Sequence, residues 1–379
     1  MPLFSRWTAD PFRLFFPLGI VLGLMGMVPW LDLVWTDRVY PAVWHKFTMI
    51  DGFMLSFVSG FLMTALPRFT RAHHATPAEI MRQMLLLLGA QAAMLAADLS
   101  LHHALTALSV ASLILFAGSR FRVRSANPPP SFVFVGFSLA LWTLASAALA
   151  AGALGWIDSP AIEAFASHVH HQSVLLGLIL GIGSRLIPAI LGWTEVAPST
   201  GTIEPSLKSL SRPTVLLAIV FFACDWIVLD HPRLGAALRA CVIASVAFVF
   251  WKIHRRPRIR TRLSVSIWIA SWFIMLSALV PIVWNHAASH GAHGTFVAGF
   301  SLLTLLVATR VTVSHTEGAF ESKLLPWIVG LLLLAAVTRV VAPLLPEHYF
   351  SHLAYAAFAW ILAVLLWSYA YLGRLLRRS

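Results

Sequence analysis

The chain has 379 residues, of which 59% are hydrophobic and 11% are charged, and its formal net charge is +12. Soluble domains average about 25% charged residues, so this composition excludes a soluble globular protein. The two cysteines, Cys224 and Cys241, are too few for a disulfide framework and lack the spacing of a zinc site.

Apolar runs of about 20 residues, each long enough to cross a bilayer, recur from end to end. They predict an all-α membrane protein in which residues 1–379 form a single polytopic transmembrane domain. About twelve transmembrane helices are expected, at residues 12–35, 44–66, 78–97, 99–118, 131–152, 165–190, 213–230, 234–252, 263–284, 293–313, 324–344 and 351–373.

Lysine and arginine lie mostly at one end of these spans. Of the 27 basic residues, only Arg38, Lys46, Arg233, Arg239 and Arg339 fall at the other end. The positive-inside rule therefore predicts that both termini are cytoplasmic. Because the basic charge follows the topology, we expect the lipid bilayer as a partner and no nucleic acid.

Histidine follows the opposite pattern. Most of the 16 histidines lie at the outer start of an even-numbered span or in the loop before it. The outer histidines are His45, His102, His103, His168, His170, His171, His231, His286, His290, His293, His348 and His352. These clusters recur about every 60 residues, which predicts weakly repeated helix hairpins.

Spacing selects the histidines that can share a metal. His286, His290 and His293 follow the pattern i, i+4, i+7, and His168 and His171 follow i, i+3, so each group lies on one helical face. Imidazole ligates haem iron, copper and zinc, and converging imidazoles can form a site. The predicted metal ligands are His45, His168, His171, His286, His290 and His293.

His170 points away from the face that His168 and His171 share. Five other outer histidines are expected to be polar tips at the membrane interface. They are His102, His103, His231, His348 and His352.

A further regularity favours three of the histidines as cofactor ligands. His45, His168 and His293 each precede a long apolar span that contains glycine. Arg185 follows His168 by seventeen residues and Arg310 follows His293 by the same number, which is about 25 Å of helix. The predicted cofactor-binding residues are His45, His168, His171, His293, Arg185 and Arg310. For Arg185, snorkelling to a lipid phosphate is the alternative.

Two acids lie inside apolar spans, Asp51 in "TMIDGFM" and Asp225 in "FFACDWIVL". An ionisable group in a membrane span is costly and is usually functional. Asp51 and Asp225 are therefore the candidates for a proton path.

Four stretches carry a resemblance to a known family. They are "DPFRLFFPLG" at 10–19, "MIDGFMLSFVSGFLMTALPRFT" at 49–70, "HVHHQSVLLGLILGIGSRLIP" at 168–188 and "HGTFVAGFSLLTLLVATRVTVSHTEG" at 293–318. Together they resemble the NnrS family of bacterial inner-membrane proteins. The family pattern H-x-H-E before the second of these stretches is His45, Lys46, Phe47 and Thr48 here, so a histidine and an acid are replaced.

The resemblance implies a multi-pass protein of the bacterial inner membrane that binds haem, with copper as a second cofactor, and responds to nitric oxide and nitrosative stress. Nitric oxide would be its ligand, and quinol or an electron-donor protein would supply electrons. The substitutions at Phe47 and Thr48 leave the copper content open. The sequence also leaves open whether the protein is an enzyme that turns nitric oxide over, or traps or senses it. Two other functions fit the same residues: a proton-coupled membrane transporter with a His/Asp relay, and an assembly factor for a membrane metalloenzyme.

Overall fold

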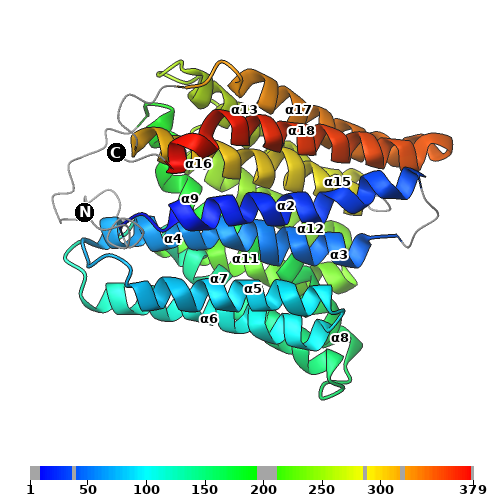
Figure 1. The fold of residues 1–379 in the computed structure, drawn as a ribbon, viewed down its shortest axis with the longest axis horizontal. Coiled ribbons are helices and arrows are strands. Elements are labelled where there is room, and N and C mark those ends of the chain that lie inside the picture. The colour runs from blue at the N-terminus through cyan, green and yellow to red at the C-terminus, as the bar shows by residue number, and fades with distance from the viewer. Residues whose placement is uncertain (1–8, 36–39, 194–210, 285–287, 316–320, 377–379) are drawn as a thin grey trace. The chain divides into compact units, whose positions relative to one another are not determined.

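The computed structural model describes residues 9–35, 40–193, 211–284, 288–315 and 321–376. All regular elements in these ranges are helices, which confirms the prediction of an all-α protein (Figure 1). The long helices are α2 (Phe12–Trp35), α4 (Leu55–Thr70), α5 (Pro77–Leu95), α6 (Leu99–Arg122), α7 (Phe132–Ala153), α9 (Val174–Ile190), α11 (Ser211–Asp230), α12 (Pro232–Ser245), α13 (Arg262–Ser277), α16 (Leu302–Ser314), α17 (Leu325–Val341) and α18 (Tyr349–Leu376). The short helices are α3 (Ala42–Phe47), α8 (Pro160–His168), α14 (Val280–Val283) and α15 (Ala288–His293).

Within the described residues, 11 helical stretches are long and apolar enough to cross a membrane. Each coincides with a predicted span, although some ends shift by several residues. The remaining predicted span, 78–97, is present as α5, whose Glu79, Arg82 and Gln83 make it less apolar. The chain is therefore a multi-pass membrane protein.

The chain forms two compact units. Unit 1 comprises residues 1–22, 46–185 and 196–229, and unit 2 comprises residues 23–45, 186–195 and 230–379. In unit 1, α5 packs along α6 and α6 packs along α7, and in unit 2 α17 packs along α18 (Figure 1). The prediction of a single transmembrane domain stays a prediction.

Three spans share an unusual local structure. Each begins with a short α-helix, continues through a wide π-type helical segment and ends in a longer α-helix. The wide segments are η1 (Thr48–Met54), η2 (Val169–Ser173) and η5 (Gly294–Ser301), which follow α3, α8 and α15. Such segments are rare and occur frequently at functional sites, and these three lie in the spans that His45, His168 and His293 open.

The N-terminal "DPFR" stretch anchors α2 to α4 within unit 1. Asp10 accepts from Arg13 Nε at 3.1 Å and from Arg68 Nη2 at 2.8 Å. The amide of Phe12 donates to Thr64 Oγ1 at 3.2 Å. Between these contacts the helices approach at Gly60, where a Cβ atom would lie only 3.1 Å from the Cα atom of Phe12.

A buried ion pair joins the start of α5 to the end of α6. Thr76 caps α5 in a capping box with Glu79, and the Arg120 side chain, with 0% exposure, binds the Glu79 carboxylate with both terminal nitrogens. Arg120 Nη2 also donates to the carbonyl of His74 at 2.9 Å, and its guanidinium lies 3.8 Å from the centre of the Phe116 ring. The arginine is therefore held by charge, hydrogen bonds and ring contact together.

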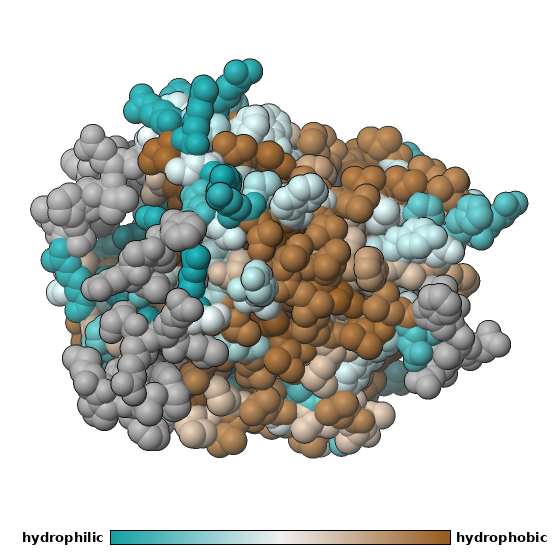
Figure 2. Space-filling model, turned by 45° about the horizontal axis from the view of Figure 1, so that its top comes forward, coloured by the Kyte–Doolittle hydropathy of each residue, from teal (hydrophilic) through white to brown (hydrophobic). Residues whose placement is uncertain are grey.

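Large apolar side chains cover the outside of the helices. Leu115, Trp327 and Tyr369 are among the exposed ones, and Figure 2 shows a broad hydrophobic area across one face. Contiguous apolar surface of this extent is rare on soluble monomers. Such a surface is suited to contact with lipid chains.

We expect Gly60→Ala to destabilise the protein, because the added methyl group meets backbone atoms of α2 that cannot rotate away. Overpacking of this kind costs about 1–3 kcal/mol. Thermal unfolding of the detergent-solubilised protein measures the loss. Gly136→Ala on α7 is the matched control, since nothing lies within 4 Å of its added Cβ. Equal unfolding temperatures for the two variants would contradict the close approach of α2 and α4.

We expect Glu79→Gln to destabilise the protein by about 2 kcal/mol, because it leaves the buried Arg120 guanidinium without its countercharge. The double variant Glu79→Gln, Arg120→Leu is expected to lose less than the sum of the two single variants, since it buries no unpaired charge. A double-mutant cycle on chemical unfolding measures this coupling. Additive losses would mean that the pair contributes no interaction energy.

Candidate functional site

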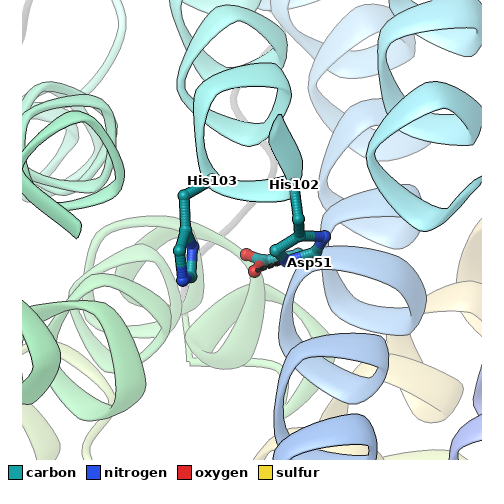
Figure 3. Close-up of side chains that lie close together, drawn as sticks. All are labelled: Asp51, His102 and His103. Atoms are coloured by element: carbon teal, nitrogen blue, oxygen red, sulfur yellow. Dashed lines mark hydrogen bonds and ion pairs between the residues drawn. The ribbon is translucent and has the colours of Figure 1, made fainter. Parts of the chain in front are cut away.

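The centre of unit 1 holds a carboxylate surrounded by nitrogen donors. Asp51 lies on η1 with 0% exposure. His102 and His103 project toward it from the first turns of α6 (Figure 3), and His170 reaches it from η2. Asp51, His102, His103, His170 and Trp142 are called the Asp51 cluster below.

The two oxygens of Asp51 have different partners. Oδ1 lies 3.0 Å from His170 Nε2 and accepts from Trp142 Nε1 at 3.3 Å. Oδ2 lies 3.0 Å from Nε2 of His102, whose Nδ1 lies 2.9 Å from the carbonyl oxygen of Ala90. One ligand atom from each of Asp51, His102 and His103 lies within 4.8 Å of the others, which is close enough for a shared metal ion.

Several nitrogens around this centre have no hydrogen-bond partner among the described residues. They are Nδ1 of His103, Nδ1 of His170 and Nε2 of His171. Unpaired polar atoms are uncommon in a buried site and call for an explanation such as an ion or an ordered water. The site is therefore rich in unused ligand atoms.

The Phe47 ring lies among four imidazoles. Its centroid is 4.6 Å from that of His103, 5.4 Å from that of His102, and 5.8 Å from those of His170 and His171. These distances are those of rings in contact. Phe47 therefore occupies the space between the imidazoles, and a macrocycle would have to displace it. A single ion beside Asp51 does not.

The prediction that His102 and His103 are polar tips at the interface is wrong, since both are buried, with 0% and 4% exposure. Asp98 caps α6 by accepting from the amide of Leu101, so α6 begins early enough to bury the two histidines in its first turns. One sequence pattern does point to this burial. His102, Thr106 and Ser109 follow helical spacing and form a buried polar stripe on α6.

The second buried acid, Asp225 on α11, also belongs to unit 1. Its Oδ1 accepts from Ser173 Oγ at 2.6 Å and lies 3.7 Å from Nδ1 of His168. His171 Nδ1 lies 3.1 Å from Ser167 Oγ. The three histidines of this segment therefore have three surroundings. His168 lies near Asp225, His170 joins the Asp51 cluster, and His171 packs on Phe47.

Unit 2 contains two further predicted ligands, His45 on α3 and His293 on α15. Each ring is fixed by a backbone carbonyl: His45 Nδ1 lies 3.1 Å from the oxygen of Gly26, and His293 Nδ1 lies 2.7 Å from that of Ser289. The His45 ring also meets the Trp30 ring edge-on, with centroids 5.3 Å apart. The two imidazoles are close enough to interact electrostatically.

Arg339 on α17 is the cation of this second group. Its Nη1 contacts Nδ1 of His290, and its charge acts on both His45 and His293. A guanidinium only donates hydrogen bonds, so Nδ1 of His290 is the acceptor and is not free to bind a metal. The remaining predicted ligand, His286, lies outside the described residues.

The two arginines predicted to bind a cofactor lie apart from these groups. Arg185, on α9, has its guanidinium 4.0 Å from the centre of the Phe69 ring. Arg310, on α16, is exposed. The cofactor role of Arg185 and Arg310 stays a prediction.

The histidine groups of unit 1 and unit 2 suit different ligands. In unit 1 the carboxylate and imidazoles of the Asp51 cluster suit one small ion, because Phe47 fills the space around them. In unit 2 the Nδ1 atoms of His45 and His293 face carbonyls and their Nε2 atoms do not, which is how metal-binding histidines are held in proteins. These residues therefore fit a ligated metal, including haem iron.

Comparison with known proteins agrees with the motifs. The family model described as "NnrS protein" matches residues 6–379. No curated protein matches the chain. The match runs through all four stretches that carry the resemblance, and through both groups of histidines. The chain therefore belongs to the NnrS family.

Proposed function

We propose that this protein binds haem in the bacterial inner membrane and acts in the response to nitric oxide. The observation that carries the proposal is the pair His45 and His293, which lie in one unit and each have an Nε2 without a hydrogen-bond partner among the described residues. Family membership supports the cellular role, and the apolar helices support the membrane.

The hydrogen bonds of the two imidazoles prepare them for ligation. A carbonyl oxygen only accepts, so Nδ1 of His45 carries the proton that it donates to Gly26, and Nδ1 of His293 carries the one that it donates to Ser289. The lone pair of each ring is then on Nε2. Donation to a carbonyl also raises the basicity of the ligating nitrogen and fixes the ring.

Arg339 adds a positive charge to the same surroundings. A cation in a membrane span is costly unless it has a partner, and Arg339 has the His290 ring. It would also pair with an acidic group at the edge of the cofactor. Ferrous haem supplies the chemistry of binding nitric oxide, while the chain supplies ligands, countercharge and an apolar shell.

The remaining predicted ligands are proposals as well. The Asp225 carboxylate lies 3.7 Å from Nδ1 of His168 and would orient that ring. His171 has an Nε2 without a partner among the described residues. Copper is the second proposed cofactor, and quinol or a donor protein is the proposed source of electrons.

We expect His45→Ala and His293→Ala to lower bound haem several-fold, because each removes an oriented ligand, and His168→Ala to lower it as well. The visible spectrum of each detergent-purified variant measures the haem. In the wild-type protein, the Soret band is expected to shift when nitric oxide is added.

His231→Ala is the matched control, since this exposed histidine lies at the start of α12, outside both groups. It should keep the full Soret band. If His45→Ala, His168→Ala and His293→Ala all kept it too, the ligand assignment would be wrong. A colourless wild-type protein would overturn the proposal that the protein binds haem.

A second candidate function is proton-coupled transport, and the Asp51 cluster favours it. A buried carboxylate with imidazoles 3.0 Å away on both sides is a proton-transferring arrangement. If this function is correct, wild-type protein in liposomes carries a pH-driven proton flux that Asp51→Asn abolishes. A pH-sensitive dye inside the vesicles measures the flux. Equal rates in wild-type, Asp51→Asn and empty vesicles would exclude the transporter.

A further inference from the structure

The bonding around Asp51 Oδ2 is incomplete. The ring of His102 lies between two oxygens, with Nδ1 at 2.9 Å from the Ala90 carbonyl and Nε2 at 3.0 Å from Asp51 Oδ2. The carbonyl can only accept, so Nδ1 carries the proton of a neutral ring. The lone pair of Nε2 then faces a carboxylate oxygen, and this contact is repulsive unless a positive species lies there.

The opposite oxygen shows no such deficit. Trp142 Nε1 donates to Asp51 Oδ1. His170 can donate from Nε2 to the same oxygen as a neutral ring, because its Nδ1 has no partner among the described residues. The missing positive charge is therefore confined to the side of the carboxylate that faces His102.

His103 supplies a further donor on this side. It projects from α6 next to His102, toward the carboxylate (Figure 3). Its Nδ1 is buried and has no hydrogen-bond partner among the described residues. The side chain itself is 4% exposed, so water does not readily replace the missing partner.

We propose that Asp51, His102 and His103 bind one transition-metal ion, in a site separate from His45 and His293. An ion about 2.1 Å from each donor of a tetrahedral site separates those donors by about 3.4 Å. The triad brackets this value, with 3.0 Å between Asp51 Oδ2 and His102 Nε2 and at most 4.8 Å between any two ligand atoms.

The ligand atoms, and the residues that orient them, favour one class of metal ion. Two imidazoles and a carboxylate suit copper or zinc rather than calcium or magnesium, and Cu²⁺ binds such sites most tightly among the divalent first-row ions. Ala90 orients His102, while Trp142 and His170 orient Asp51, so the ligands are held from behind as metal ligands usually are. The role of the metal rests on the proposed function, whereas the position of the site does not.

Copper uptake by the full-length protein tests the site. The protein is purified in detergent through a tag without histidine, stripped with a chelator, and given Cu²⁺ alone with excess glycine as competitor. We expect one retained equivalent, with nitrogen coupling in the electron paramagnetic resonance spectrum. His103→Leu should weaken retention about tenfold or more, and Asp51→Asn should weaken it as well.

His352→Leu is the matched control, since His352 also has a buried nitrogen without a partner among the described residues, but lies outside the triad. It should retain copper. Loss of copper in His352→Leu together with retention in His103→Leu would overturn the site, and so would a wild-type protein that retains none. In the latter case the species between Asp51 and His102 is a proton.

The haem spectrum separates this proposal from the proposed function. His103→Leu should leave the Soret band unchanged, whereas His45→Ala should leave copper retention unchanged. A protein that binds haem and retains no copper would overturn only the proposed metal site. A protein that retains copper and binds no haem would overturn only the proposal of haem binding.

Discussion

A carboxylate inside a membrane-spanning bundle must be neutralised where it lies, because water is not available to solvate it. Asp51 is surrounded by His102, His170 and Trp142, which come from α6, η2 and α7. Four segments distant in sequence thereby share one acid. Their relative positions follow from its hydrogen bonds as much as from apolar packing, which is non-directional and does not select one rotation of a helix over another.

The sequence predicts most of the fold because a bilayer leaves few alternatives. Backbone groups in lipid must bond within the segment, so each long apolar run becomes a helix, and all predicted spans are found as helices. The sequence also identifies Asp51 as unusual, because an acid in an apolar run is visible without a structure. The four family-like stretches are equally visible, and the family match confirms them.

The partners of Asp51 could not be predicted in the same way. His102 and His103 lie at the end of an apolar run, where a histidine is usually solvated, whereas here Asp98 caps the helix and both side chains are buried. The surroundings of His168, His170 and His171 depend on the wide turns of η2. Helical spacing assumes 3.6 residues per turn throughout, so it assigns His168 and His171 to one face, whereas the structure gives them different neighbours. Charge and hydropathy carry no information about such a change of phase.

The wide segments η1, η2 and η5 have a consequence for how these spans can change over time. In a regular α-helix, a residue added within a span rotates everything beyond it by roughly 100°, whereas a wide turn holds the added residue as a local bulge. The outer and inner halves of such a span can thus evolve as separate surfaces, one facing a reactive centre and the other facing its packing neighbours. Loss of one codon in such a segment would remove the wide turn and restore α-helical hydrogen bonding there, while leaving composition and hydropathy almost untouched.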